Sequence, residues 1–383
     1  MNETAYMLWL AGTQEVGRKA ALGLCEIYGP EELWNMPENR LLMLPQLHGK
    51  AANRLLQRRN ERAVVSELEG LSKKGIWLLT YGGADYPGGL KDIDDPPLLL
   101  YGLGTMPPES MPRVAVIGAR KCSSYGLSVA KKIAYGLAGA GFAIVSGLAR
   151  GIDCQAHVSA IDAVTEANGE ESARPVTIAV LGCGVDVCYP PENYSQYKRI
   201  LNHGCVLSEY PPGTAPSKYM FPQRNRIISG LSLGIVVVEA AERSGTGTTV
   251  NMALAQGREV FVVPGSILSH LSAGTNNMIK DGAIPVTSHE DVVWALRREL
   301  GHDFFGSALN AHETGNGEHN IKHNLTKEEK TMLNALSTEP VDVDALAAST
   351  GIAAQDVMFF MSKLELAGLV KPVRGLGYVK TYS

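Results

Sequence analysis

The chain has 383 residues, which is more than one average domain, so we expect a large core with smaller units attached. Hydrophobic residues make up 45% and charged residues 19%, an ordinary globular composition that excludes bulk disorder. The formal net charge of -4 excludes a histone-like basic surface, so any binding of a polyanion must depend on local clusters of positive charge.

Residues 1–70 are predicted to form a small helical domain, similar to SAM or helix-hairpin-helix domains. The start, MNETAYMLWLAGTQ, lacks the positive segment of a secretory leader, and no run of about 18 apolar residues occurs, which favours a soluble, cytoplasmic protein without membrane contact. Lys50, Arg54, Arg58 and Arg62 recur every four residues and predict a basic stripe on one helix face. Solvation is the default interpretation of this stripe, and accessory DNA contact is the minority one.

Residues 71–300 are predicted to form the main domain. From Ile76 onward, helical stretches separate short apolar runs, most of which end in glycine: IWLLTY, PLLLYG, RVAVIG, FAIVSG, VTIAVLG, GIVVVEA and EVFVVPG. This alternation is typical of an α/β fold in which helices cover both faces of a parallel sheet. We therefore expect an extended Rossmann-like sheet.

Residues 301–325 are polar and rich in Gly, Asn and His, which predicts a linker. Its four histidines have irregular spacing, so a solvated loop is favoured over a zinc site. Residues 326–383 contain three helical patterns and a hairpin pattern, which together predict a winged-helix domain. This last unit holds six Lys/Arg against seven Asp/Glu, which argues against a transcription regulator that reads DNA through it.

Four glycine turns follow predicted strands and lead into helices. Ligands of open parallel sheets bind beyond the carboxyl ends of the strands, where free N–H groups at helix N-termini suit phosphate. We expect all four turns to open on one edge of the sheet. The third turn is AVLGCGVDVCYPPEN. The residues expected to bind in the other three are Gly118, Arg120, Lys121 and Ser123, then Gly147 and Arg150, and finally Ser244, Gly245 and Thr246.

A basic segment with aromatic residues precedes the strand GIVVVEA. Arginines interleaved with aromatic rings suit contact with phosphates combined with stacking of bases, as in proteins that bind single-stranded nucleic acid. The candidate residues of this segment are Lys218, Phe221, Arg224, Asn225 and Arg226, with Tyr219 beside them.

Signatures of catalysis and of cofactor binding are missing from the sequence. It contains no G-x-G-x-x-G after a strand, no P-loop, no G-x-S-x-G and no H-E-x-x-H. Asp153 and His157 would share a helix face, but capping and packing are favoured over a metal or acid/base pair. The six cysteines form no C-x-x-C pair, which favours a reducing compartment. We expect no catalytic residue, no metal and no cofactor.

Eight segments in order resemble the DNA-processing protein A family, also called Smf: GARKCSSYG, SGLARGIDCQAH, LGCGVDVCYPPEN, LSEYPPG, FPQRNRIISGLS, ERSGTGTT, VPG and SAGTNNMIKDGA. The resemblance implies a homodimer that binds single-stranded DNA on an extended Rossmann fold. It also implies that the protein protects incoming DNA during natural transformation and helps to load a RecA-type recombinase, without enzymatic activity. Asn276 joins the expected DNA contacts through this resemblance, and Ala119 stands where many relatives have a small hydroxyl residue.

The rival hypothesis is a nucleotide-processing enzyme of the Rossmann-like phosphoribohydrolase type. Such enzymes carry a P-G-G-x-G-T motif, and the corresponding stretch here is SGTGTT at residues 244–249. Glu239 and Glu242 lie upstream of this stretch, whereas the enzymes have a carboxylate after the loop. The sequence therefore favours a DNA-binding protein over this enzyme.

Overall fold

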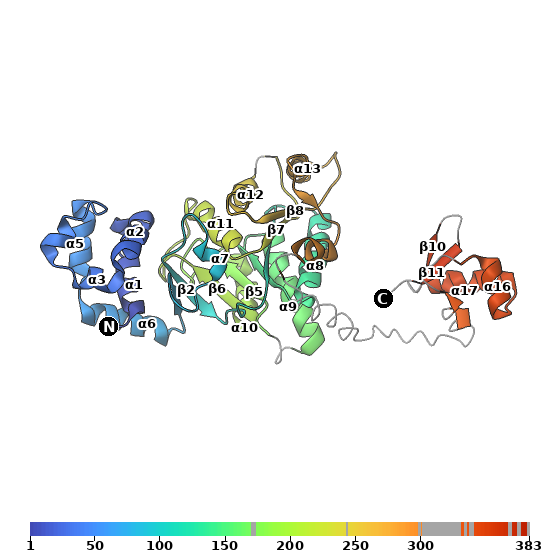
Figure 1. Cartoon of the computed structure of the whole chain (residues 1–383), viewed down its shortest axis with the longest axis horizontal. Coiled ribbons are helices and arrows are strands. Elements are labelled where there is room, and N and C mark those ends of the chain that lie inside the picture. Colours follow the sequence, from blue (N-terminus) through green and yellow to red (C-terminus); the bar gives the residue numbers. More distant parts are fainter. Residues whose placement is uncertain are drawn as a thin grey trace. The chain divides into compact units, whose positions relative to one another are not determined.

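The computed structural model describes residues 1–169, 174–242, 244–297, 300, 331–332, 335–336, 341–366, 370–373 and 377–380. They fall into two compact units, Met1–Ala308 and Leu309–Ser383 (Figure 1). The predicted linker, residues 301–325, lies outside the described residues. The predicted domain limits at residues 70, 300 and 325 stay predictions.

The N-terminal part of the first unit is helical, as predicted. Its core contains Trp9, whose indole N–H donates to the carbonyl of Leu55 at 3.0 Å and ties the first helix to the fifth. Asn2 and Asn60 cap the first and last of these helices with their side chains. The elements are α1 (Glu3–Ala11), η1 (Gln14–Val16), α2 (Arg18–Tyr28), α3 (Pro30–Asn35), α4 (Glu38–Leu42), α5 (Gly49–Arg58) and α6 (Glu61–Lys73).

The predicted basic stripe of this region is wrong in its extent. Helix α5 ends at Arg58, and Arg62 belongs to the next helix, α6. Arg54 pairs with Glu15 at 3.4 Å, and Arg58 pairs with Glu67 at 3.2 Å. The four-residue spacing in the sequence did not reveal the break at Arg59 and Asn60 or the acidic partners. Much of the positive charge of the stripe is therefore compensated within the domain.

A nine-stranded, mostly parallel sheet forms the centre of the first unit, with the strand order β1-β2-β6-β5-β4-β3-β7-β8-β9. The seven strands β6, β5, β4, β3, β7, β8 and β9 run parallel. β1 pairs antiparallel with β2, and β2 pairs antiparallel with β6. The bounds are β1 (Trp77–Thr80), β2 (Leu99–Gly104), β3 (Arg113–Ile117), β4 (Ala143–Ser146), β5 (Thr177–Val180), β6 (Gly204–Ser208), β7 (Gly234–Val237), β8 (Glu259–Val262) and β9 (Ile284–Pro285).

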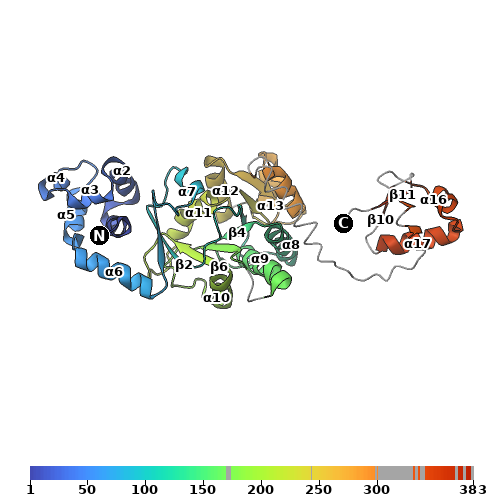
Figure 2. The same ribbon diagram turned by 60° about the horizontal axis from the view of Figure 1, so that its bottom comes forward.

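Helices cover both faces of the sheet (Figure 2). Successive residues of a strand point to opposite faces. Val114 and Val116 of β3 therefore pack in the core of α8 (Ser124–Gly139) and α9 (Ile152–Asn168), whereas Ala115 packs in the opposite core. Helix α10 (Tyr194–His203) joins the first face. Helices α7 (Gly88–Lys91), α11 (Met220–Gly230) and α12 (Gly245–Ala255) build the second.

The fold class agrees with the prediction, and two strands were missed. β6 has the sequence GCVLS, which follows a helix without a glycine turn of the predicted kind, and β9 has only two residues. The parallel pattern predicted for the whole domain holds from β3 to β9 but not for β1 and β2. Apolar runs that are buried on both faces look the same in either direction of pairing, so this difference was not visible in the sequence.

The second unit has the features of the predicted winged helix. α16 (Val343–Thr350) and α17 (Ala354–Leu366) precede an antiparallel hairpin of β10 (Val370–Val373) and β11 (Gly377–Lys380). Leu346 of α16 packs with Val357, Met361 and Leu364 of α17 in one small core. Most of the first predicted helix, in residues 325–337, lies outside the described residues.

Candidate nucleic-acid interface

The four predicted turns open on one edge of the sheet, because β3, β4, β5 and β7 run parallel and all end there. A cleft of about 660 Å³ lies at this edge, within the size range of small-molecule binding sites. Segments that are far apart in the chain meet in it, from Ile117 to Leu271. The predicted residues that line the cleft are Gly118, Arg120, Lys121, Lys218, Phe221, Arg224, Asn225, Ser244, Gly245 and Thr246.

The loop after β3 is shaped by a buried carboxylate. Glu239 accepts hydrogen bonds from both the backbone N–H and the hydroxyl of Ser123, at 2.9 and 2.5 Å. Its own carbonyl accepts from the N–H of Ala119 at 2.8 Å. A Cβ on Gly118 would lie only 2.8 Å from Ile152, so this position has no room for a side chain. The loop is therefore fixed before any ligand arrives.

Ser123 is not among the residues that line this cleft. Its hydroxyl accepts from the N–H of Gly126 at 3.0 Å and so caps helix α8, as the sequence suggested. Because it also donates to Glu239, the hydroxyl acts both as a donor and as an acceptor within the fold. Ser123 thus positions the loop of Arg120 and Lys121.

Three exposed cations line the cleft, and two of them lie over aromatic rings. The guanidinium of Arg120 lies over the ring of Phe221 at 5.7 Å from its centroid, and Lys218 lies over Tyr219 at 5.0 Å. Lys121 is exposed as well. Within the described part of the chain, none of the three cations has a carboxylate within 4.0 Å. Their charge is therefore available to an anion.

Arg224 forms the floor of the cleft and is buried. Its Nη1 donates to the carbonyl of Gly147 at 2.9 Å and also to that of Val180, the last residue of β5. Burial lowers the pKa of Arg224 to about 10, and the nearby carboxylate of Asp153 opposes this shift. A Cβ on Gly147 would lie 2.5 Å from the guanidinium, so glycine makes the room that Arg224 needs. Gly147 therefore serves Arg224 rather than a ligand.

Asp153 and His157 are structural, in agreement with the sequence interpretation. Asp153 accepts from the N–H of Ala149 at 3.4 Å, and burial raises its pKa although Arg224 opposes the rise. The hydroxyl of Thr177 donates to the carbonyl of Ile144, so it accepts the proton on Nδ1 of His157, 2.7 Å away. Burial, together with the nearby positive charge of Arg224, lowers the pKa of His157 to about 3. This histidine is neutral at physiological pH.

The N-terminus of α12 lines the cleft as well. The helix begins at Gly245, and the side chain of Ser244 makes no capping bond. The first N–H groups of a helix have no acceptors within it and carry partial positive charge. Ser244, Gly245 and Thr246 therefore present donors that an oxyanion can accept.

Besides Ser123 and Gly147, three more predicted residues lie outside the cleft lining and are held by other groups. Arg150 is exposed but forms an ion pair with Glu192. Arg226 is buried between Asp95 at 3.2 Å and Glu209 at 2.7 Å. Asn276 exchanges two hydrogen bonds with the backbone of Gly265, at 3.1 and 3.2 Å. Sequence reasoning brought the right segments together, but it did not separate exposed charges from those that are satisfied inside the fold.

Tyr189 lines the cleft and was missed as a site residue. It belongs to the third turn, AVLGCGVDVCYPPEN, which was recognised without naming any residue. Its ring stacks on that of Phe221, with the centroids 5.4 Å apart and the planes at 30°. The sequence signal that could have identified Tyr189 is an aromatic residue in a turn that follows a predicted strand.

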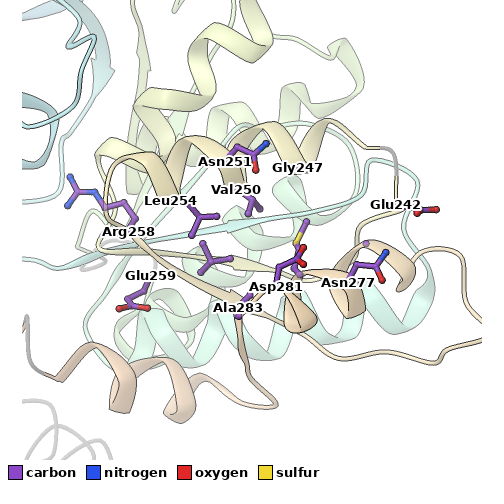
Figure 3. Close-up of a pocket in the computed structure, with 14 residues that line it drawn as sticks. Glu242, Gly247, Val250, Asn251, Leu254, Arg258, Glu259, Asn277, Asp281 and Ala283 are labelled. Atoms are coloured by element: carbon purple, nitrogen blue, oxygen red, sulfur yellow. The ribbon is translucent and has the colours of Figure 1, made fainter.

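A second cleft, of about 330 Å³, lies between α12 and α13 (Ala273–Lys280) and contains none of the predicted residues (Figure 3). Glu242, Glu259 and Asp281 contribute three carboxylates to it. Arg258 is a cation of this lining, and it donates to the backbone carbonyls of Gly89 and Gly230. This balance of charge disfavours a polyanion, so the cleft beside β3 is the candidate interface.

No group of three or more His, Cys, Asp or Glu side chains in the described ranges is placed to hold a metal ion. Among the same residues, no helix is long and apolar enough to cross a membrane.

Comparisons with known proteins agree with the fold. The family model for DNA recombination-mediator protein A matches residues 77–297, and the model for the DprA winged helix domain matches residues 320–375. The chain is 32% identical over 404 residues to Protein Smf of Synechocystis sp., covering 98% of each chain. It is 46% identical over 208 residues to the DNA processing protein DprA of Streptococcus pneumoniae, which is 54% of this chain and 70% of the relative.

Two solved structures are similar to the chain. The X-ray structure of DprA from Streptococcus pneumoniae has a TM-score of 0.63 and 33% identity, covering 76% of this chain and 98% of its own. A structure of DNA processing protein A from Helicobacter pylori, described for its single-stranded DNA binding mode, has a TM-score of 0.50 and 28% identity, covering 58% and 96%. The matched family model spans more than half of the 383 residues. The chain therefore belongs to the DNA recombination-mediator protein A family.

Proposed function

We propose that this chain binds single-stranded DNA in the cleft beside β3, protects incoming DNA during natural transformation and helps to load a RecA-type recombinase. The observation that carries the DNA-binding step is the set of exposed cations that line the cleft. Arg120, Lys121 and Lys218 have no carboxylate partner among the described residues, although the whole chain is negative. The structure of the Helicobacter pylori relative, described for its single-stranded DNA binding mode, supports this proposal.

Single strands suit this cleft better than a duplex. Phe221 is only partly exposed and lies among cations, so a base that reaches its ring must leave the stack of its own strand. Bases of a duplex have both faces covered, whereas those of a single strand are free to stack on aromatic rings. The cations and the N-terminus of α12 then hold the phosphates on either side.

The partners follow from membership of the family rather than from the geometry. We propose that the chain acts in the cytoplasm as a homodimer and hands single strands to a RecA-type recombinase. The fifteen predicted contact residues stay candidates. The cleft supports Arg120, Lys121, Lys218 and Phe221 as direct contacts, and it supports Ser123, Gly147 and Asn276 as residues that shape the loops.

We propose that the chain has no catalytic activity of its own. Glu239, the carboxylate that the rival enzyme hypothesis would use, is 2% exposed and accepts two hydrogen bonds from Ser123. Asp153 is also buried, and it accepts a backbone N–H. Both groups are engaged in shaping loops. The phosphoribohydrolase alternative is not favoured, since Glu239 does not line the cleft, and Asp153, which does, is buried and accepts a backbone N–H.

A pair of matched lysine variants tests the proposed site. Lys121 lines the cleft and Lys131 lies on α8 outside its lining, and both are exposed. In titrations of an oligothymidylate at several salt concentrations, Lys121→Ala is expected to weaken binding. It should also reduce the slope of log K against log salt by about 0.7, the contribution of one phosphate contact in a single strand. Lys131→Ala should leave both unchanged. Equal behaviour of the two variants would refute this placement.

A further inference from the structure

We propose that Tyr189 is a second base-stacking residue. Together, Tyr189 and Phe221 form a two-ring platform on which nucleobases of a bound strand stack. This inference rests on the proposed function and deepens it, because it names a contact that none of the predicted residues supplies. The ligand group is a nucleobase of single-stranded nucleic acid. Every base has a π-face, so the platform would accept any of the four.

The geometry of the two rings fits a platform rather than a core contact. Their planes meet at 30° with 5.4 Å between centroids, which is an offset stack. Both residues line the cleft, and Tyr189 is 38% exposed. Phe142 and Phe261, which pack in the hydrophobic core, are fully buried in contrast. An aromatic pair with a ring open to a cationic cleft leaves apolar surface that a base can cover.

The turn that carries Tyr189 is held by hydrogen bonds at residues 184–186, just before this ring in the chain. The carboxylate of Asp186 accepts from the N–H of Gly213 at 2.6 Å, and the N–H of Gly184 donates to the carbonyl of Thr214 at 2.9 Å. The phenol of Tyr197 donates to the carbonyl of Val185 at 2.7 Å. These contacts fix the backbone, so the ring is presented with little loss of conformational entropy on binding.

Cations lie beside both rings. Arg120 lies over Phe221. The pKa of Arg150 is raised, mainly by its hydrogen bond to Glu192, and the phenol of Tyr189 makes a smaller contribution to this rise. A strand whose bases stack on the two rings would keep its phosphates within reach of these guanidinium groups. The phenolic oxygen of Tyr189 makes no hydrogen bond to any described residue. The ring, rather than the hydroxyl, is therefore the part with a function.

The test compares variants of the full chain on two probes of equal length: an oligothymidylate and an abasic deoxyribose-phosphate oligomer. Tyr189→Ala is expected to weaken binding of the oligothymidylate about fivefold or more, the lower range for one stacked base. Binding of the abasic oligomer and the salt slope should stay unchanged, because the phosphate contacts remain. Tyr189→Phe should bind like the unmodified chain, since it keeps the ring.

Two further variants keep the test decisive. Tyr189→Leu retains apolar packing against Phe221 without a π-face, so it should lose affinity like Tyr189→Ala even if the alanine variant is less stable. Tyr194 is the matched control: it is 54% exposed, stacks on Tyr197 and has Lys198 over its ring, but it does not line the cleft. Tyr194→Ala should bind like the unmodified chain.

The outcomes separate this inference from the function on which it rests. Unchanged binding of the oligothymidylate by Tyr189→Ala and Tyr189→Leu would overturn the role of Tyr189 and leave the proposed function intact. An equal loss on the abasic oligomer would also overturn it, because the residue would then act through structure or charge. Failure of the unmodified chain to bind single strands would overturn both proposals.

Discussion

Arg150 illustrates how a single neighbour decides whether a charge is available. Its side chain is 59% exposed, but Glu192 forms an ion pair with it, and the pKa of Glu192 is lowered by the hydrogen bond from Arg150. The second predicted turn is therefore close to neutral in the free protein. A phosphate that approaches Arg150 must compete with the carboxylate.

Glu192→Gln is expected to strengthen binding of single-stranded DNA and to steepen the salt slope by about 0.7, if Arg150 then pairs with one phosphate. Salt-dependent titration measures both quantities. Asp162→Asn is the control. Asp162 forms an ion pair with Arg199 at 2.8 Å, and neither residue lines the cleft. The same gain in both variants would show a general effect of net charge and would remove Arg150 from the interface.

Individual residues also show what the sequence could and could not predict. The residue types of the site were predicted from FPQRNR and the glycine turns, and the cleft contains most of them. Arg224 and Arg226 look alike in the sequence, but one lies below the cleft and the other pairs with Asp95 and Glu209. Those acidic partners lie 131 and 17 residues away in the chain, so only the tertiary structure identifies them.

At the scale of elements, the loop between β3 and α8 depends on β7. Glu239 lies just beyond β7, and its carboxylate fixes Ser123 at the start of α8. The sheet places β3 beside β7, so this side chain links two neighbouring turns of the cleft. The sequence predicted the two turns but not the bond between them, because no local pattern encodes it.

Glu239→Gln is expected to destabilise the chain by about 1.5–3 kcal/mol, the range for loss of hydrogen bonds to a charged group. The affinity for single-stranded DNA should fall with it, because the loop of Arg120 and Lys121 loses its anchor. Urea unfolding and DNA titration measure the two effects. Glu242→Gln, an exposed neighbour, should change neither. A stable Glu239→Gln variant with unchanged binding would contradict this account of the loop.

His157 predicts a pH dependence of stability. Its pKa is about 3 in the folded chain and about 6.5 when unfolded, so between these values the unfolded state binds the additional proton. Stability contributed by the neutral ring is present above pH 6.5 and is lost as the pH falls. Between pH 7 and pH 5 the unmodified chain should lose about 2 kcal/mol more than His157→Gln, which stays neutral. Equal losses in urea unfolding would contradict the burial of a neutral histidine.

At the scale of the whole molecule, the winged helix lacks the positive charge that DNA binding favours. Its helix α17 carries Asp356 and Lys363 on described positions, and residues 326–383 together are slightly acidic. A phosphate backbone would meet no excess of positive charge there. The family model for this domain identifies the fold of the unit but does not assign it a role.

Truncation after residue 300 is expected to leave a folded first unit whose affinity for single-stranded DNA lies within a few-fold of the full chain, a difference below about 1 kcal/mol. Circular dichroism checks the fold and titration checks the affinity. A tenfold loss at unchanged salt, with the first unit still folded, would make the winged helix a DNA-binding element.

The central claim is that the cleft beside β3 binds single strands through phosphate contacts and base stacking. The most direct measurement is a titration of the full chain with single-stranded and double-stranded DNA of equal length at several salt concentrations. The account predicts clearly tighter binding of the single strand, little dependence on its sequence, and affinity that falls as salt rises. Equal affinity for the duplex would contradict it.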